Sequence, residues 1–308
     1  MHNISPTHTV SPAHKEDAFS DNLNSMLRDD GGLEAWLQLK VFQEDVDEFF
    51  FLALECTTHK TGFPTLLIIG TKRLYVVAAQ SRDRVKDPKE WMTRKVVIHT
   101  LGLVDLRAVA VGPRYQYLRL DPAESCPVPQ AALLFLTPVH EKAHTFVDAL
   151  AQKVKSSYEM MDDYDPEGTQ IGFEVAYLAR QTRANFTSNI IKSKKNRTPP
   201  PATICVYAFV QYGEKREPMT LVVTPLRVFV CKDEFYRLPV PKNQFTKERE
   251  VTITEIASVS LDRCSLTINE DKESWVVFFP NKQELALAVS VIEQLYYAKL
   301  RIPLVKED

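Results

Sequence analysis

The chain has 308 residues, of which 44% are hydrophobic and 25% are charged, and its formal net charge at pH 7 is −2. This composition is ordinary for globular proteins, and the length allows two domains. The nearly neutral charge argues against nucleic-acid or membrane binding by the molecule as a whole, so such binding would need a local patch.

No apolar run approaches the roughly 20 residues that span a bilayer, and the N-terminal residues have no apolar core of a signal peptide. The odd number of cysteines, without a CxxC pair, favours reduced core thiols. We therefore expect a cytoplasmic protein, with peripheral attachment to endosomal or plasma membranes left open.

Residues 1–32 are rich in Ser, Thr, Pro, His and Asn, and this composition predicts a disordered tail. A first domain is expected over 33–158, where short β-rich segments alternate with turns. These expected strands cover 49–56, 65–79 as a pair joined at 70–72, 94–100, 106–111, 115–121 and 131–137. From position 138 the apolar residues recur every three or four positions, which predicts an amphipathic helix.

An acidic segment with Pro and Gly, 159–170, begins an expected linker over 159–198 that holds a possible helix and a basic stretch. A second domain is expected over 199–304. Its strand-like segments cover 204–212, 220–231, 250–261, 264–268 and 274–280. A final helix follows, and Asn281 and Glu284 give it a start that resembles a capping box.

The two halves repeat the same order of segments. TLLIIGTKRLYVV at 65–77 matches TLVVTPLRVFVC at 220–231 with one gap, and each half ends in an apolar strand followed by an amphipathic helix. This similarity favours duplication of one domain over two unrelated β domains. We predict a mainly β protein of two pleckstrin-homology-like barrels, each capped by a C-terminal α-helix; no βαβ alternation supports a doubly wound fold.

The segments TLLIIGTKRLYVV, VDLRAVAVGPRYQYLRLD and LLFLTPVHEKAHTFVDAL, with LVVTPLRVFVCKDEF, WVVFFP and LYYAKLRIPL in the second half, carry a family resemblance. The chain resembles the tandem pleckstrin-homology-like region of nischarin, the serine/threonine kinase 11-interacting protein and the pleckstrin-homology family M proteins. This resemblance implies an adaptor or scaffold in endosomal or cytoskeletal signalling. The chain departs from ordinary pleckstrin-homology domains because neither closing helix contains a Trp.

One string, His140-Glu141-Lys142-Ala143-His144, fits the H-E-x-x-H pattern of zinc hydrolases. In that interpretation the two histidines would bind zinc and Glu141 would activate water. The pair lies beside the apolar face at the frayed start of the helix, and no third ligand stands out. We therefore prefer surface histidines and predict no catalytic, cofactor-binding or metal residues, no cofactor and no enzyme activity.

Basic side chains suggest a weak contact with acidic lipids, although an exposed, charged linker is the preferred interpretation of the stretch around 195. The acidic segment QEDVDE at 43–48, interpreted as the first strand–strand loop of domain one, argues against phosphoinositide binding there. The leading hypothesis is protein-partner binding, without nucleic acid or a small-molecule substrate. The candidate lipid-contact residues are Lys192, Lys194, Lys195, Arg197, Lys215 and Arg216.

Overall fold

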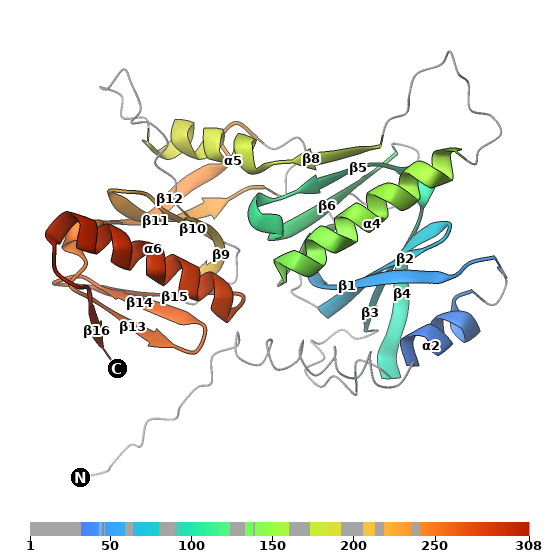
Figure 1. Cartoon of the computed structure of the whole chain (residues 1–308), viewed down its shortest axis with the longest axis horizontal. Helices are drawn as coiled ribbons and strands as arrows, with labels where there is room; N and C mark the ends of the chain where they lie inside the picture. Colours follow the sequence, from blue (N-terminus) through green and yellow to red (C-terminus); the bar gives the residue numbers. More distant parts are fainter. Residues whose placement is uncertain are drawn as a thin grey trace, which may run out of the picture.

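The computed structural model describes residues 32–42, 45, 47–58, 64–79, 90, 93–123, 133–137, 139–159, 173–191, 206–212, 219–235 and 241–307. The tail predicted over 1–32 lies outside these residues except for Gly32, which begins the first helix. Two β domains lie side by side, each with a long helix across its sheet (Figure 1). Among the described helices, none is both long and apolar enough to cross a membrane.

The first domain is an eight-stranded sheet of order β4-β3-β2-β1-β7-β6-β5-β8. Neighbouring strands are antiparallel except β8, which runs parallel to β5. Its elements are α2 (Gly32–Lys40), β1 (Phe50–Thr58), β2 (Pro64–Gly70), β3 (Arg73–Ala79), β4 (Lys95–Gly102), the 3₁₀ helix η1 (Leu103–Asp105), β5 (Leu106–Val111), the 3₁₀ helix η2 (Pro113–Tyr115), β6 (Tyr117–Pro122), β7 (Leu134–Leu136), α4 (His140–Glu159) and β8 (Glu174–Tyr177).

The second domain has the corresponding order, β12-β11-β10-β9-β15-β14-β13-β16. Its last strand, β16, again runs parallel to the fifth strand of the domain, β13. The elements are α5 (Ala179–Phe186), the π-helical turn η4 (Thr187–Ile191), β9 (Val206–Tyr212), β10 (Met219–Val223), β11 (Arg227–Asp233), β12 (Phe245–Thr252), the 3₁₀ helix η5 (Ile253–Glu255), β13 (Ser258–Asp262), β14 (Ser265–Asn269), β15 (Ser274–Phe278), α6 (Lys282–Leu300) and β16 (Val305–Glu307).

The repeat extends to irregular features of the backbone. The register of β3 against β4 shifts between Val76 and Val77, and that of β11 against β12 shifts between Val230 and Cys231. These pairs occupy matching positions of the repeated sequence segment. A 3₁₀ helix follows β4 in one domain and β12 in the other. The repeated order of elements predicted from the sequence is therefore confirmed.

The sheets are open rather than closed barrels. One edge strand of each sheet is β4 or β12, and the other is the short parallel strand β8 or β16. In the described part of the chain, no pairing joins these two edges. The mainly β class with a C-terminal helix in each domain is confirmed. The expected closure is corrected, because β8 and β16 extend one edge of each sheet.

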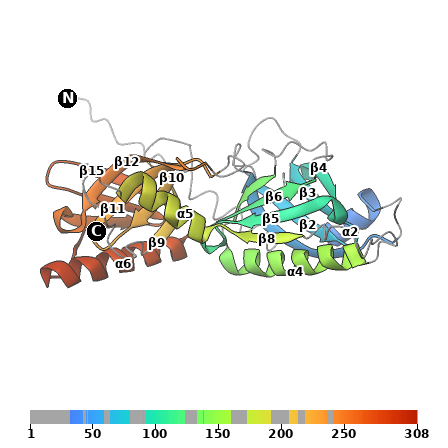
Figure 2. The same cartoon turned by 90° about the horizontal axis from the view of Figure 1, so that it is seen from above.

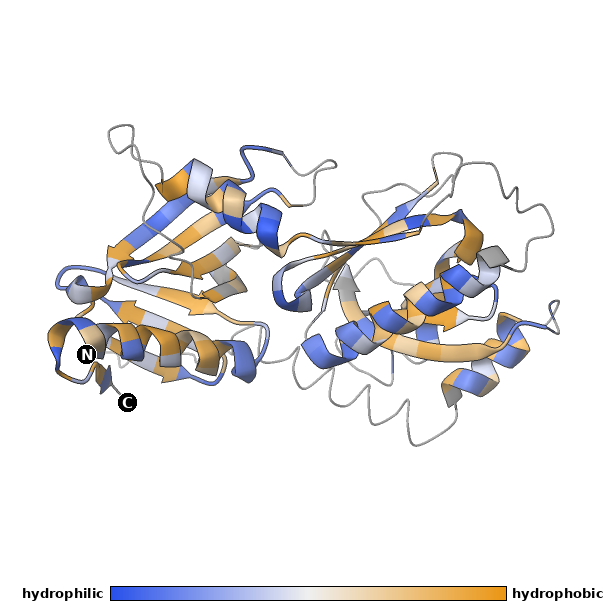
Figure 3. Ribbon diagram, turned by 45° about the horizontal axis from the view of Figure 1, so that its top comes forward, coloured by the Kyte–Doolittle hydropathy of each residue, from blue (hydrophilic) through white to orange (hydrophobic). Residues whose placement is uncertain are grey.

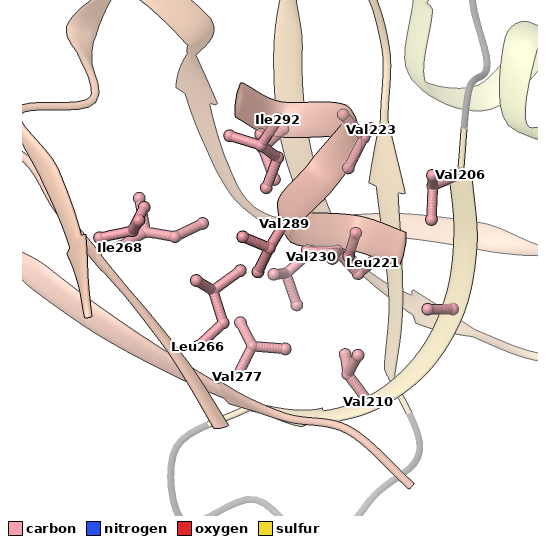
Figure 4. Packing of buried hydrophobic residues seen from close by; sticks show 14 of the residues in the cluster. Val206, Val210, Leu221, Val223, Val230, Leu266, Ile268, Val277, Val289 and Ile292 are labelled. Carbon is pink, nitrogen blue, oxygen red and sulfur yellow. The ribbon is translucent and has the colours of Figure 1, made fainter. Parts of the chain in front are cut away.

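Each long helix buries one face against the interior of its sheet. The buried residues of α4 and α6 have the same spacing, at i, i+3, i+4, i+7 and i+11, so the two helices use the same packing surface. Figure 4 shows the second core, where Val289 and Ile292 of α6 meet strand side chains. The helix residues are Ala143, Phe146, Val147, Leu150 and Val154 in α4, and Leu285, Ala288, Val289, Ile292 and Tyr296 in α6.

A second helix covers the outer face of each sheet. Leu33 and Leu37 of α2 pack with residues of β2 and β3, and Phe186 of α5 packs with Phe229 and Phe245 of β11 and β12. The range 159–198 therefore contains more than a linker with a helix. Its β8 completes the first sheet, while α5 and η4 cover the second. Periodicity missed β8 because the strand has only four residues.

Candidate functional site

The two domains meet at a buried carboxylate, Glu284, in the first turn of α6. Its side chain is 1% exposed and accepts hydrogen bonds from the first domain. The donors are Arg114 Nη2 at 2.9 Å and Gln116 Nε2 at 3.2 Å, and His140 Nδ1 lies 3.2 Å from Glu284 Oε1. A buried charge is tolerated only where it is paired and hydrogen-bonded, so this contact ties the domains together in one arrangement.

The local fold explains why Glu284 points outward from its own domain. Asn281 caps α6, with its Oδ1 accepting from the Glu284 N–H at 2.9 Å. The predicted cap is thus present, but the Glu284 carboxylate accepts from the other domain. Arg114 has a left-handed backbone (φ 54°) in η2, and this turn directs its guanidinium towards Glu284.

An apolar contact lies in the same domain interface. The rings of Tyr117 on β6 and Phe235, just after β11, have centroids 4.4 Å apart. Both side chains are buried, with Leu178 and Leu134 in the same cluster. Gly112 makes room for the tyrosine, because a Cβ at that position would lie 2.3 Å from a Tyr117 ring carbon. The junction therefore combines a charged contact with an aromatic one.

A second buried carboxylate, Asp233 at the end of β11, supports the loop that carries Phe235. Its Oδ1 accepts from Phe235 N at 3.0 Å and from Gln244 Nε2 at 2.8 Å, while Oδ2 accepts from Thr220 Oγ1 at 2.9 Å. Burial raises the pKa of Asp233 to about 7, although these hydrogen bonds oppose the shift. The carboxyl thus titrates near neutral pH.

The His-Glu-x-x-His residues do not act as a unit. His140 Nδ1 faces Glu284, whereas His144 Nδ1 lies 3.2 Å from Asp148 on an exposed side of α4. Desolvation lowers the pKa of His140, and Glu284 opposes this effect. No group of three or more His, Cys, Asp or Glu that could hold a metal occurs among the described residues. The expectation of two surface histidines is correct for His144 but wrong for His140, which is largely covered at the junction.

The six candidate lipid-contact residues, at 192, 194, 195, 197, 215 and 216, all lie outside the described residues. The interpretation of QEDVDE is wrong, because β1 begins at Phe50 and the first strand–strand loop is 59–63, which also lies outside. The acidic segment instead contacts the β2–β3 turn. Asp45 pairs with Lys72 at 2.9 Å, and Glu48 Oε1 accepts from the backbone N–H groups of Lys72 and Arg73.

The outward faces of the two closing helices differ in charge. Superposing their buried residues places Gln152 of α4 at the position of Gln294 in α6, and Asp148 at that of Ser290. Between Glu284 and Glu293 the sequence of α6 contains no charged residue. Figure 3 shows α6 mainly hydrophobic between its ends, whereas hydrophilic segments recur along α4. Both helices lie along the same side of the molecule (Figure 2).

Sequence reasoning missed the junction because its partners are far apart along the chain. Arg114 and Glu284 are separated by 170 positions. One clue was available for Asp233, an acid that ends a strand segment, RVFVCKD, with four apolar residues at its centre. The Asn281-x-x-Glu284 pattern pointed to a local cap and gave no sign of the contact across the domains.

A family model described as "PLEKHM2 PH domain-like" matches residues 23–164, which is less than half of the chain. The matched range includes β1 to β7 and α4, so the match covers the strands and closing helix of the first domain. It supports the pleckstrin-homology-like part of the predicted resemblance. The likeness to nischarin and the serine/threonine kinase 11-interacting protein stays a prediction.

Solved structures give weaker likenesses. The FERM and C-terminal domain complex of Drosophila Merlin is 14% identical, with a TM-score of 0.27 over 50% of this chain and 42% of that one. The human Sac2 hSac2 domain is 14% identical, with a TM-score of 0.31 over 56% and 91%. Autoinhibited Vav1 is 11% identical, with a TM-score of 0.28 over 51% and 28%.

This chain thus spans less than half of the Merlin and Vav1 chains, and at these TM-scores the likenesses carry no functional argument. A comparison with curated protein sequences found no match. A pleckstrin-homology-like fold suggests a protein- or lipid-binding module, which is as far as the family match reaches. The first half of the chain has the pleckstrin-homology-like fold, and the second half repeats its strand order and closing helix.

Proposed function

We propose that this protein is a non-enzymatic adaptor that holds two pleckstrin-homology-like domains in a fixed relative orientation and binds protein partners. The observation that carries this proposal is the Glu284 junction, where a buried carboxylate of one domain contacts three side chains of the other. A connection of this kind fixes the spacing of surfaces on both domains. That is useful for a scaffold, whereas independently acting modules would not need it.

The outward face of α6 is the surface we assign to the partner. Ala286, Leu287, Ser290 and Gln294 are exposed or half-buried there and carry no charge. Depletion of charge is typical of the central part of protein interfaces. The corresponding face of α4 carries His144 and Asp148, so the fold itself does not require an uncharged helix surface at this position.

A matched pair of variants tests this assignment. Gln294→Arg places a charge on α6, and Gln152→Arg places the same charge at the corresponding exposed position of α4. We expect affinity capture followed by mass spectrometry to show proteins that the wild type and Gln152→Arg retain and that Gln294→Arg loses. Equal capture by all three forms would contradict the assignment to α6.

Two other functions stay open to test. Weak attachment to acidic membranes through Lys192, Lys194, Lys195 and Arg197 predicts salt-sensitive binding to acidic liposomes that is lost when these four residues become Ala. A zinc hydrolase predicts stoichiometric zinc that disappears in His144→Ala, which metal analysis of the purified chain measures. We place the adaptor in the cytoplasm, with endosomal or plasma-membrane attachment and the signalling role of the resembling families as parts of the same proposal.

A further inference from the structure

The end of α6 carries an unbroken run of exposed residues. Residues 297–303, YAKLRIP, are all exposed in succession. A helix that packs on a sheet normally alternates buried and exposed positions, so this end projects beyond the sheet that α6 covers. Tyr297 is 54% exposed, Leu300 37% and Ile302 53%. We call residues 297–303 the α6 tip.

The α6 tip is held in a defined shape. Arg301 ends the helix in the left-handed conformation (φ 60°), and its N–H donates to the Tyr297 carbonyl at 2.9 Å. Leu304 then returns to the core, and β16 pairs with β13. Lys306 of β16 forms an ion pair with Glu293 of α6. The exposed apolar side chains are therefore presented by a fixed turn, and ordering them at a binding surface costs little additional entropy.

Charge and shape identify the kind of surface that the tip fits. The seven residues contain two cations, Lys299 and Arg301, and no acid. Neither cation forms an ion pair within the part of the chain that the structure describes. Cations alternate here with Leu300 and Ile302, and a tyrosine lies one turn earlier. Interfacial membrane anchors combine these residue types, with the apolar groups at the acyl boundary and the cations at anionic headgroups.

We propose that the α6 tip docks the protein on an anionic lipid surface, with Leu300 and Ile302 inserted and Lys299 and Arg301 at the headgroups. A projecting tip suits a deformable lipid surface, whereas a protein would need a hollow of matching shape. Of the corresponding end of α4, the structure describes the side chains of Lys155, Ser156 and Ser157, and these three residues include no large apolar side chain. This proposal is independent of the protein-binding face on α6.

Vesicle sedimentation with the full chain tests the proposal, using phosphatidylcholine vesicles with and without phosphatidylserine. Lys299→Gln with Arg301→Gly removes both charges, and glycine keeps the left-handed turn. Each cation near an anionic surface is worth about fivefold in affinity, so we expect a loss of about 25-fold. Leu300→Ser with Ile302→Ser should weaken binding by at least about tenfold. Leu39→Ser on α2, where the side chain is 69% exposed, is the matched apolar control and should bind like the wild type.

Binding to acidic vesicles that both double variants lose and that Leu39→Ser keeps supports the proposal. Binding that survives the loss of Leu300 and Ile302 overturns it, because electrostatic attraction alone would then suffice. Loss confined to the variant that changes Lys192, Lys194, Lys195 and Arg197 overturns it as well and assigns the contact to that stretch. Absence of vesicle binding by the wild type also overturns it. Urea unfolding midpoints equal to the wild type show that the variants fold, and Ile302→Ser alone replaces the double variant if its midpoint falls.

Discussion

Replacing Asp233 by Asn should remove a large part of the pH dependence of stability in the second domain. The carboxyl of Asp233 is buried, and burial raises its pKa from 3.8 to about 7. Between these values the folded state holds a proton that the unfolded chain has released. Stability therefore falls as pH rises from about 4 to about 7 and then levels off. The full loss is about 4 kcal/mol, at about 1.4 kcal/mol for each pH unit.

Asparagine fits the same hydrogen bonds. Its Oδ1 can accept from Phe235 N and Gln244 Nε2, and its Nδ2 can donate to Thr220 Oγ1, since a hydroxyl both donates and accepts. Relative to the wild type, Asp233→Asn should thus gain about 2.5 kcal/mol between pH 5 and pH 8. Urea unfolding at pH 5, 6, 7 and 8 measures this difference. Asp262→Asn, at an exposed position of β13, is the control and should follow the wild type.

The reasoning would be refuted if the wild type and Asp233→Asn kept a constant difference in unfolding free energy across this pH range. A constant difference would mean that the carboxyl stays ionised in the folded protein at pH 5. It would also mean that the donors around it, Phe235 N, Gln244 and Thr220, outweigh the desolvation that raises its pKa.

Four further substitutions test the core and the junction. Leu150→Ala and Ile292→Ala each remove a side chain that is at most 1% exposed, so each should lower the free energy of unfolding by about 2–5 kcal/mol in urea titrations. Glu284→Ala removes an acceptor of the buried Gln116 amide and should cost about 1–3 kcal/mol, with a larger radius of gyration in small-angle scattering; unchanged scattering would contradict a rigid junction. Gly112→Ala should displace the Tyr117 ring and so lower the urea concentration at which the protein unfolds. An unchanged urea midpoint would show that the ring moves without a cost in stability.

Local pattern predicted most of the fold because the helix and strand periods differ. The apolar spacing from Ala143 to Val154 indicated α4, and the alternation and turn at Gly70 separated β2 from β3. The same reasoning failed for β8, whose four residues pair with β5 across a distance of 66 positions from Ala108 to Glu174. A short parallel edge strand depends on a distant partner, and no local period reveals it.

The candidate site was less predictable than the fold for a related reason. The alternation of YQYLRLD predicted a strand, but it could not show that Tyr117 faces Phe235 of another domain. His140 was expected beside the apolar face at the solvent border, and solvent there is replaced by the second domain and Glu284. Local sequence determines which way a side chain points from its own element. The identity of what lies opposite depends on how the two domains pack.

The duplicated fold offers a way to separate what packing requires from what function requires. At buried positions α4 and α6 agree, since both must fill the interior of the same kind of sheet. At outward positions no packing demand applies, and surface changes usually alter stability by less than about 0.5 kcal/mol. The absence of charged residues between Glu284 and Glu293 of α6 is therefore not explained by folding, because α4 performs the same structural task with Asp148 and His144 at corresponding positions. Placing charges on α6 at Gln294 should leave the unfolding free energy unchanged, so any loss of binding in that variant would report on function alone.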